Sequence, residues 1–496
     1  MLRIRTVKTA SGARAVQVIY YLDRKRVIYK HIGSGKTDAE VDSLITVAQD
    51  FIDNYSPELP FREEKQFNNL LFLDKAKFLG VDYSFLHEVL SEVMTKVGLS
   101  RIKNHLLQDL VVMRIFEPCS KLRSIELLDT YFGIKHRRQA FYSSARNWLS
   151  LKEKVEKLVI EFVKKTYSFD FQILFYDVTT LYFETFEPDD LRKPGFSKDN
   201  KSQQPQILIG LTVTSDGFPV DYEVFAGNTF EGHTIIPFVK SLIKKHKIEK
   251  FTVVADAAMI SNANIEELSK EGISYIVGAR LGNVPRSLVR QIDDKLPRAE
   301  GKNIRLVTEK GYLICSYSDS RYRKDKYEME KQVQRAEMLL KEPGKIKKVK
   351  FLKTENQNPS LNQDLIERTK VLLGVKGYYT DLSEQEADNQ TIIARYHELY
   401  KIEQAFRMSK SDLKTRPIFH FKEEPIKLHL LICFMALVVC KQIELSTGVS
   451  IKKFLTEMKR ITDARLFNEI THKEIRKRAQ MTPIVRDLLR KLNLPH

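Results

Sequence analysis

The chain has 496 residues, 43% of them hydrophobic, which is enough apolar material for several folded domains and argues against intrinsic disorder. Its 82 Lys and Arg residues outnumber 64 Asp and Glu residues, and the net charge of +18 favours a polyanionic partner, nucleic acid first; a basic surface that only aids solubility is the alternative. Four scattered cysteines without a Cys-x-x-Cys pair argue against a disulfide framework or a zinc site and fit a reducing cytoplasm.

The first 35 or so residues form short alternating runs that are separated by turn residues. They predict a small three-stranded sheet rich in Arg and Lys, which either contacts DNA or simply caps the N-terminus. No apolar stretch typical of a secretory signal occurs here. The predicted segments are strands at Arg3–Lys8, Ala15–Leu22 and Arg26–Ile32, a helix from about Asp38 to Tyr55, and a linker marked by Pro57 and Pro60.

Helical patterning dominates from about Ser84 to Lys165, with breaks at Gly98, Pro118 and Gly133. Several short helices with basic residues between them suit a DNA-binding domain, for which a helix-turn-helix is one arrangement. A bundle that serves packing alone is the alternative. The single tryptophan of the chain, Trp148, is predicted to lie in the core.

The stretch Phe171–Glu184 is rich in aromatic and β-branched residues and predicts a strand. Both of its faces are largely apolar, so we expect a central strand that is covered on both sides. Asp177 lies within it, where an unpaired carboxylate is costly unless a cation is near. The alternative is an aspartate at a frayed strand end or bonded to a turn.

A second aspartate follows a second strand. Phe251–Val254 is a short apolar strand that leads into Asp256, and Ser261 then caps a helix that runs through Leu268. Asp256 thus lies at the carboxyl end of a strand, where open α/β sheets commonly bind ligands; a purely capping role is the alternative. The neighbouring predicted elements are a hairpin of Gln206–Thr214 and Phe218–Phe225, a helix at about Thr234–His246, and a strand at Ser274–Val277.

A third stretch, Ile392–Leu413, contains neither Pro nor Gly and predicts one helix. Leu399, Ile402, Phe406 and Leu413 form an apolar stripe along it. An acid, two tyrosines and two cations share the neighbouring face, namely Tyr396, Tyr400, Glu403, Arg407 and Lys410. For a helix taken alone, a solvated face with local ion pairs is the simpler interpretation. Together with the two aspartates, however, Glu403 suggests a carboxylate cluster for hard divalent cations.

These three stretches resemble the Asp-Asp-Glu (DDE) transposases of bacterial insertion sequences. Within them, they resemble the group with the signature Y-x2-R-x3-E-x6-K. In this chain the signature is Tyr396, Leu399, Glu403 and Lys410, so that a leucine replaces the arginine and Arg407 is the candidate cation in its place. The resemblance covers roughly residues 171–421.

The resemblance implies an α/β fold with a ribonuclease-H-like core, and a DNA transposase that frees 3′-OH ends of an element and joins them to target DNA. It implies Asp177, Asp256 and Glu403 as the catalytic residues and as ligands of two Mg²⁺ ions, for which Mn²⁺ would substitute. The implied partners are double-stranded DNA, at the element's terminal inverted repeats and at the target, and a second copy of the chain in the DNA complex; no membrane is involved, and the location is the nucleoid in the cytoplasm of a bacterium or archaeon. The residues expected to contact DNA are Tyr396, Arg407, Lys410, Lys414 and Arg416.

The pattern changes between Arg280 and about Leu372, where a hairpin around Lys310-Gly311, a charged helix at Arg321–Lys341 and the basic run Gly344–Lys350 predict an inserted, mostly β subdomain with one helix. Its basic edge either holds flanking DNA or is a solvated charge run. The apolar run Leu428–Cys440 is too short to span a bilayer and predicts a buried helix. The predicted domains are 1–60 (small and β-rich, with a helix), 61–167 (helical), 168–290 (first part of the core), 291–372 (insertion), 373–445 (second part of the core) and 446–496 (basic and helical).

Two other functions share these features. A metal-dependent nuclease that cleaves without joining would use the same carboxylates. A non-catalytic DNA-binding protein on a decayed transposase scaffold is the other alternative, and the presence of all three acids argues against it.

Overall fold

The computed structural model of the protein describes residues 2–22, 25–53, 76–169, 171–196, 203–246, 248, 251–259, 261–341, 349–355, 358–469 and 472–495. The chain divides into two compact units. This division does not test the six predicted domains, which stay predictions. The first unit comprises Met1–Leu90, Glu126–His136 and Lys453–His496, and the second comprises Ser91–Ile125 and Arg137–Lys452.

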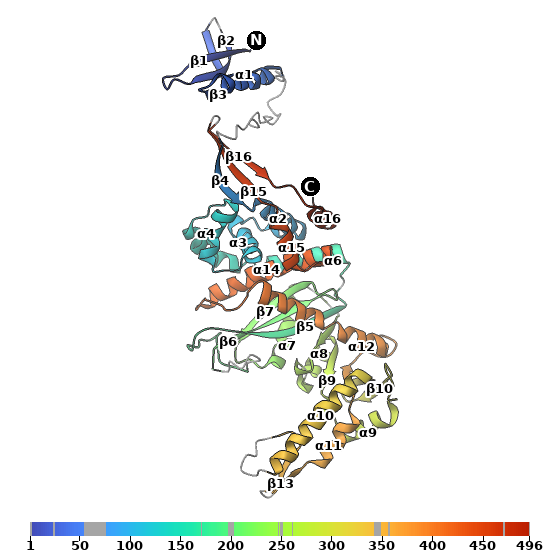
Figure 1. Ribbon diagram of the computed structural model, residues 1–496. Coiled ribbons are helices and arrows are strands. Elements are labelled where there is room, and N and C mark those ends of the chain that lie inside the picture. Colours follow the sequence, from blue (N-terminus) through green and yellow to red (C-terminus); the bar gives the residue numbers. More distant parts are fainter. Residues whose placement is uncertain are drawn as a thin grey trace. The chain divides into compact units, whose positions relative to one another are not determined.

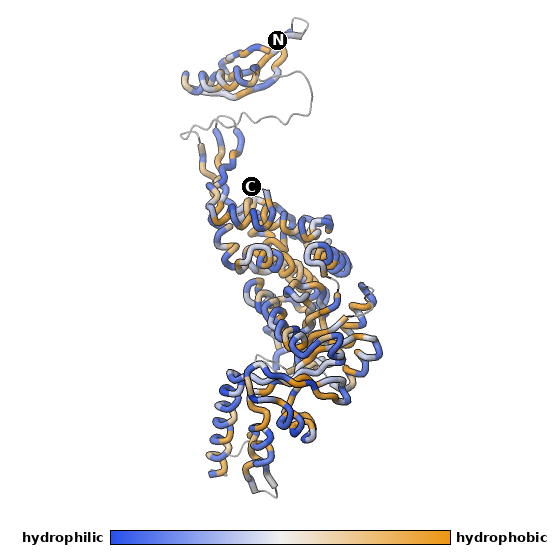
Figure 2. The backbone as a smooth tube through the Cα atoms, turned by 90° about the vertical axis from the view of Figure 1, so that its right-hand side faces the viewer, coloured by the Kyte–Doolittle hydropathy of each residue, from blue (hydrophilic) through white to orange (hydrophobic). Residues whose placement is uncertain are grey.

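The first unit begins with an antiparallel sheet of three strands, β1 (Arg3–Lys8), β2 (Arg14–Leu22) and β3 (Lys25–Gly35), in the order β1-β2-β3. Helix α1 (Asp38–Asp53) packs against all three strands. The polar and apolar residues alternate along these strands, as Figure 2 shows near the N-terminus. The predicted strands and helix are confirmed, whereas the linker at Pro57 and Pro60 lies outside the described residues. The core consists of Val16, Val18, Val41, Leu44 and Ala48.

A second sheet of the first unit joins distant parts of the chain. Strand β4 (Ala76–Asp82) pairs with β15 (Asp463–Asn468), which pairs with β16 (Lys473–Arg478), all antiparallel. Helices α15 (Ile451–Met458) and α16 (Pro483–Lys491) flank the hairpin. The prediction of a wholly helical C-terminal region is therefore wrong, because the hairpin depends on pairing with β4 rather than on local pattern.

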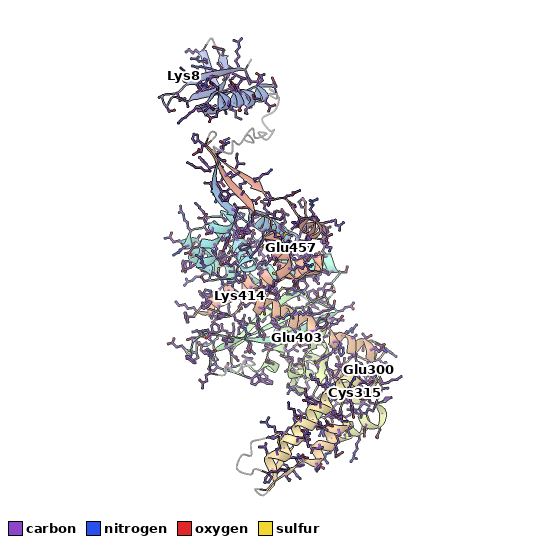
Figure 3. The ribbon with its side chains drawn as sticks, in the orientation of Figure 1. Lys8, Glu300, Cys315, Glu403, Lys414 and Glu457 are labelled. Atoms are coloured by element: carbon purple, nitrogen blue, oxygen red, sulfur yellow. The ribbon has the colours of Figure 1, made fainter. Side chains whose placement is uncertain are left out.

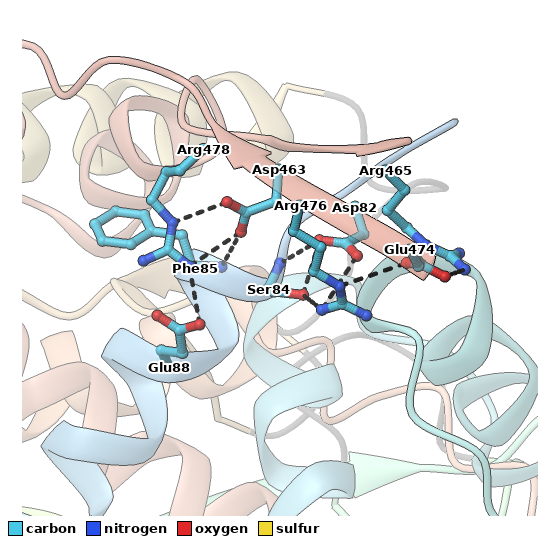
Figure 4. A network of polar contacts seen from close by, with 9 residues as sticks. All are labelled: Asp82, Ser84, Phe85, Glu88, Asp463, Arg465, Glu474, Arg476 and Arg478. Atoms are coloured by element: carbon cyan, nitrogen blue, oxygen red, sulfur yellow. Dashed lines mark hydrogen bonds and ion pairs between the residues drawn. The ribbon is translucent and has the colours of Figure 1, made fainter. Parts of the chain in front are cut away.

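Arginines of β16 tie this second sheet to the helix that follows β4, as Figure 4 shows. Arg478 Nε donates to Asp463 Oδ1 at 2.8 Å, and its Nη2 donates to Glu88 at 2.9 Å. Arg476 donates to the hydroxyl of Ser84 at 3.1 Å and lies 3.6 Å from Asp82. The contacts of Arg478 with Glu88 and of Arg476 with Ser84 connect residues that are almost four hundred positions apart in the sequence.

Short helices follow β4, as the sequence predicts, and Trp148 is buried among them with 2% of its surface exposed. The buried helix α14 (Glu423–Thr447) packs against α3, α5 and α6. Among the described residues, α14 alone has the length and apolar composition of a membrane span, and 94% of its most apolar window is buried inside the protein, as in a core helix. The short helices are α2 (Ser84–Val97), α3 (His105–Phe116), α4 (Lys121–Phe132), α5 (Arg138–Leu149) and α6 (Lys152–Tyr167).

The second unit is built on a mixed sheet of eight strands, in the order β10-β11-β14-β9-β8-β5-β6-β7. Figure 1 labels β5, β6, β7, β9 and β10 of this sheet. Strands β5, β8 and β9 are parallel, and the other pairs are antiparallel. The predicted order of strand, hairpin, helix, strand, helix, strand is confirmed and is consistent with a ribonuclease-H-like core. The elements are β5 (Ile173–Tyr182), β6 (Gln206–Val213), β7 (Pro219–Ala226), α7 (Ile235–His246), β8 (Thr252–Ala255), α8 (Asn262–Lys270), β9 (Ser274–Ala279), β10 (Asn303–Thr308), β11 (Gly311–Tyr317) and β14 (Val375–Thr380).

The segment after β9 differs from the prediction. Its hairpin, β10–β11, is present and extends the core sheet through β14, while α10 and α11 share a hydrophobic cluster of their own. The 22-residue helix α10 and the nine-residue α11 outweigh the strands, so the prediction of a mostly β insertion is wrong. Most of the basic run at 344–350 lies outside the described residues. The remaining elements are α9 (Arg286–Lys295), α10 (Asp319–Leu340), β12 (Leu352–Glu355), β13 (Asn358–Leu361) and α11 (Gln363–Val371).

Candidate active site

The two aspartates predicted from sequence lie at matching positions of neighbouring strands. In the parallel pair β5–β8 the last matched residues are Tyr176 and Ala255, and the next residue in each chain segment is Asp177 and Asp256. Adjacent strands lie about 4.8 Å apart, so the two aspartates occupy neighbouring backbone positions where the parallel pairing ends. Asp177 is half-buried and Asp256 is exposed.

The side chain of Asp177 points to one defined face of the sheet. Its neighbour Tyr176 points to the other face, where its hydroxyl lies 2.8 Å from Thr234 Oγ1 and its ring packs on Phe238 of α7. Because side chains alternate along a strand, Asp177 faces away from α7. It thus shares a face with Thr179, which lines a small apolar cavity together with Phe406.

Phe406 belongs to α13 (Tyr400–Arg407), which follows α12 (Asn389–His397). Helix α13 packs against β5 and β6, and α12 packs against β8 and β9. The prediction of one continuous helix over Ile392–Leu413 is wrong, since a turn at Glu398 separates α12 from α13 and a π-helical turn, Met408–Asp412, follows α13. The predicted apolar stripe is confirmed as core: Leu399, Ile402, Phe406 and Leu413 are all buried.

Tyr396 connects α12 to the aspartate of β8. Its hydroxyl donates a hydrogen bond to Asp256 Oδ1 at 3.1 Å. The ring is buried, and the Lys376 ammonium of β14 lies 4.7 Å from its centroid. Gly278 of β9 makes this position accessible, because a Cβ atom there would lie 2.5 Å from the Tyr396 hydroxyl oxygen.

The negative charges of Asp256 and of Glu403 on α13 both affect the pKa of Lys376. Burial lowers the pKa of Lys376, the nearby Arg321 lowers it further, and the negative charges of Asp256 and Glu403 oppose both effects. Burial raises the pKa of the Tyr396 phenol, and the charges of Asp256 and Glu403 raise it further. Both acids therefore act on the same lysine and the same tyrosine.

The three predicted acids, Asp177, Asp256 and Glu403, are not grouped as a metal-binding site in this structure. Glu403 is exposed on α13 (Figure 3). In the described part of the chain, no three or more His, Cys, Asp or Glu side chains are grouped so that they could hold one metal ion. Asp177 and Asp256 offer the adjacent oxygen donors that Mg²⁺ and Mn²⁺ prefer, so this pair fits a divalent cation. The complete set of three ligands is not assembled.

Comparison with known proteins identifies the family. Residues 168–439, more than half of the chain, match the family described as "Transposase DDE domain". The chain belongs to this DDE transposase family. The match does not resolve the subgroup with the Tyr-Arg-Glu-Lys signature, which stays a prediction.

Solved structures of other transposases are only distantly similar. The piggyBac transposase synaptic complex with hairpin DNA is 12% identical with a TM-score of 0.37, over 76% of this chain and 69% of that one. The Mos1 transposase paired-end complex is also 12% identical, with a TM-score of 0.16 over 47% of this chain and 66% of that one. TM-scores this low support no conclusion about this transposase. No curated protein matches the chain.

Of the predicted DNA-contacting residues of the transposase, Tyr396 is buried and bonded to Asp256, and the other four follow Glu403 along the chain. Arg407 and Lys414 are exposed, and Lys410 is half-buried in the π-helical turn. The guanidinium of Arg416 lies 5.3 Å from the ring centroid of Tyr182, the last residue of β5. Their roles in DNA binding stay predictions.

A large cavity beside Asp256 was not predicted from the sequence of the transposase. It has a volume of about 560 Å³, and both Asp256 and Tyr396 line it. Residues of β9, α10, α11 and β14 surround it, so its lining comes from segments that are far apart in the sequence and carry no shared motif. Its cationic lining residues, Arg280, Arg321, Lys350, Arg368 and Lys376, outnumber its acidic ones, Asp256, Asp325 and Glu328.

Proposed function

We propose that this DDE transposase mobilises an insertion sequence by cutting the element ends and joining them to target DNA. The observation that supports this most directly is the matched position of Asp177 and Asp256, each the first residue after the parallel pairing of β5 with β8. The Tyr396 hydroxyl, which holds Asp256, adds a positioning group. The basic cavity beside Asp256 adds a place for phosphates of a DNA strand.

In this proposal Asp177, Asp256 and Glu403 would hold two divalent cations, Mg²⁺ or Mn²⁺, whose positive charge would favour in-line displacement at phosphorus. Asp177 lies on the strand face toward α13, and Tyr396 fixes the orientation of Asp256. Glu403 joins the pair through a movement of α13. This helix is short and has irregular backbone at both ends, so it can shift without unwinding a longer element.

The chemistry has two steps. Water hydrolyses one phosphodiester bond at the element end and leaves a 3′-OH. That hydroxyl then attacks a phosphodiester of target DNA, so one bond forms as another breaks and no external energy source is needed. Tyr396, Arg407, Lys410, Lys414 and Arg416 position the DNA in this scheme. Two chains act together because two element ends must be paired, and the site of action is the nucleoid.

The proposal is tested by cleavage and strand transfer with a plasmid that carries the reading frame and its flanking DNA. D177N, D256N and E403Q should each lower the cleavage rate by about a hundredfold or more, because transition-state charge stabilisation is lost. E398Q is the matched control, since Glu398 lies between α12 and α13, is partly exposed and forms an ion pair with Lys401 at 3.4 Å. It should stay within about twofold of the wild type, as surface substitutions usually do.

The alternatives give different results in the same experiment. A nuclease without joining activity would cut the plasmid but would not insert an oligonucleotide that already carries a free 3′-OH into supercoiled target DNA. A non-catalytic DNA-binding protein would show no metal-dependent cleavage, or would show equal cleavage for the wild type and D177N. Either outcome would overturn the proposal.

A further inference from the structure

The N-terminal sheet has one face covered by α1 and one face open. The covered face is identified by its packing, since Ile4, Val16 and Val18 lie in the core beneath α1. Side chains alternate between the faces, and residues paired across an antiparallel ladder point to the same side. Arg3 pairs with Ile19, and Arg5 pairs with Gln17, so these four residues belong to the open face, on which Ile19 is itself buried while Arg3 is exposed.

The pairing of β2 with β3 completes the open face. Gln17 pairs with His31, Ile19 with Ile28, and Tyr21 with Arg26. Tyr21, near the end of β2, and Ile28, on the edge strand β3, are 56% and 52% exposed, so this face presents a large aromatic and an aliphatic side chain to solvent. We define the open face by these residues: Arg3, Arg5, Gln17, Ile19, Tyr21, Arg26, Ile28 and His31.

The charged residues of the open face, Arg3, Arg5 and Arg26, are all cationic, and the surrounding segment is also basic. Residues 1–37 contain nine Lys or Arg residues and a single acid, Asp23. Arg3 and Arg5 form no ion pair with any acid in the described part of the chain. A cationic sheet face that also exposes an imidazole, a phenol and an apolar side chain is complementary to a polyanion whose surface is read by hydrogen bonds and methyl contacts.

We propose that the open face lies in the major groove of double-stranded DNA and reads base sequence at the element ends. This inference rests on the proposed function. Three strands spaced by about 4.8 Å have a backbone width of about 10 Å, and the major groove is about 12 Å wide. Strands are known to enter DNA grooves in other proteins. Two irregularities in the β2–β3 register add local twist, which suits a curved groove.

The arginines and the exposed isoleucine of the open face have matching base edges. Arg3, Arg5 and Arg26 donate to guanine O6 and N7. Ile28 contacts thymine methyl groups. Lysines around the sheet bind phosphates and set the register without reading sequence.

The test selects the DNA sequences that the full chain binds. The library consists of duplexes that carry a randomised segment, and the buffer contains Ca²⁺ and no Mg²⁺. The wild type should enrich one motif. The triple variant R3Q/R5Q/R26Q should lose that motif, with the ratio of specific to non-specific affinity falling by about tenfold or more. The matched control K154Q/K157Q/K165Q removes the same charge from exposed positions of α6 and should keep the motif.

Two further measurements distinguish a failure of sequence recognition from a failure of the proposed chemistry or of folding. D177N should enrich the same motif as the wild type, so a failure of the proposed chemistry leaves the reading of sequence intact. The open-face variant should have an unchanged melting temperature, because its arginines lie outside the α1 core. If R3Q/R5Q/R26Q keeps the motif at wild-type affinity, or if the wild type enriches none, the open face does not read DNA.

Discussion

At the scale of single residues, the position of Asp256 depends on a glycine. Tyr396 can approach Asp256 only because residue 278 has no side chain. The hydrogen bond fixes one carboxylate oxygen and leaves the other for a ligand. A tyrosine with a raised pKa stays a neutral donor at any physiological pH, so this orientation does not change with pH.

Gly278→Ala should therefore reduce catalysis without unfolding the protein. The new methyl group would lie 2.5 Å from the Tyr396 hydroxyl oxygen, so the ring must move and Asp256 loses its donor. We expect the single-turnover cleavage rate to fall by about ten- to a hundredfold, as small misplacements in active sites do. Gly282→Ala is the control, because a Cβ atom at that position would meet nothing within 4 Å. Equal rates for both variants would contradict this role of Gly278.

Lys121 is a second residue whose environment makes a measurable prediction. It is buried, and its ammonium contacts His429 Nδ1, while His429 Nε2 lies 2.9 Å from the Thr415 carbonyl oxygen. Burial first, and then the nearby Arg114, lower the pKa of Lys121 to about 7. In the folded protein Lys121 is therefore neutral above that pH, whereas in the unfolded chain it stays charged up to its ordinary pKa.

This difference gives stability a defined pH dependence. Between about pH 7 and the ordinary lysine pKa the unfolded chain binds the extra proton, so the wild type gains stability as pH rises. From about pH 7 to about pH 9 the gain relative to Lys121→Met should be about 2 kcal/mol. Urea unfolding followed by Trp148 fluorescence measures it at each pH. A difference between the two proteins that does not change with pH would contradict the shifted pKa.

At the scale of elements, a buried ionic cluster joins α6, β7 and α7. Lys245 Nζ lies 2.6 Å from Glu223, 3.3 Å from Glu156 and 3.5 Å from Asp221. Lys152 contacts the same acids, with its shortest distance, 2.7 Å, to Glu156. Burial, and then the charge of Asp221, raise the pKa of Glu156 to about 8. The cluster stabilises the edge of the sheet only while its cations are present.

Lys245→Met should destabilise the protein by about 3–5 kcal/mol, because it leaves buried carboxylates with too little positive charge. Lys240→Met is the matched control on the same helix, since Lys240 is exposed and its pairs with Glu267 and Glu271 lie at the surface. It should leave the free energy of unfolding nearly unchanged, because solvent screens exposed ion pairs. Chemical denaturation of both variants under one buffer condition provides the comparison. Similar losses for the two would show that the cluster is not energetically distinct.

Elements that are determined by local pattern could be predicted from the sequence. Strand β5 and helix α8 carry an apolar run and a Ser261 N-cap, and both are present. The break at Glu398 could not be predicted, because no Pro or Gly interrupts the stretch and the turn is set by packing of α12 and α13 on different strands. The acids of the candidate site could be predicted because they follow local strand and helix patterns. The contact between Gly278 and Tyr396 could not, because it depends on how α12 packs on β9.

At the scale of the whole molecule, the first unit is assembled from both ends of the chain. Strand β4 has an exposed apolar surface at Phe78, Leu79 and Val81 and pairs with β15 along its length. Neither strand could be predicted, because each depends on a partner almost four hundred residues away and on no local periodicity of its own. The charged contacts of β16 then hold the hairpin against the first turn of α2.

Arg478→Gln should make local opening of the β15–β16 hairpin easier. Arg478 donates to Asp463 and Glu88, and its guanidinium lies 4.9 Å from the ring centroid of Phe85. Without it Asp463, which is only 3% exposed, keeps the Phe85 amide as a donor but loses its cation. We expect the free energy of local opening of β15 and β16 to fall by about 1–3 kcal/mol, which amide hydrogen exchange measures. Arg486→Gln, at an exposed position of α16, should leave the exchange of these strands unchanged. Equal protection in all three proteins would mean that backbone pairing with β4 alone holds the chain ends together.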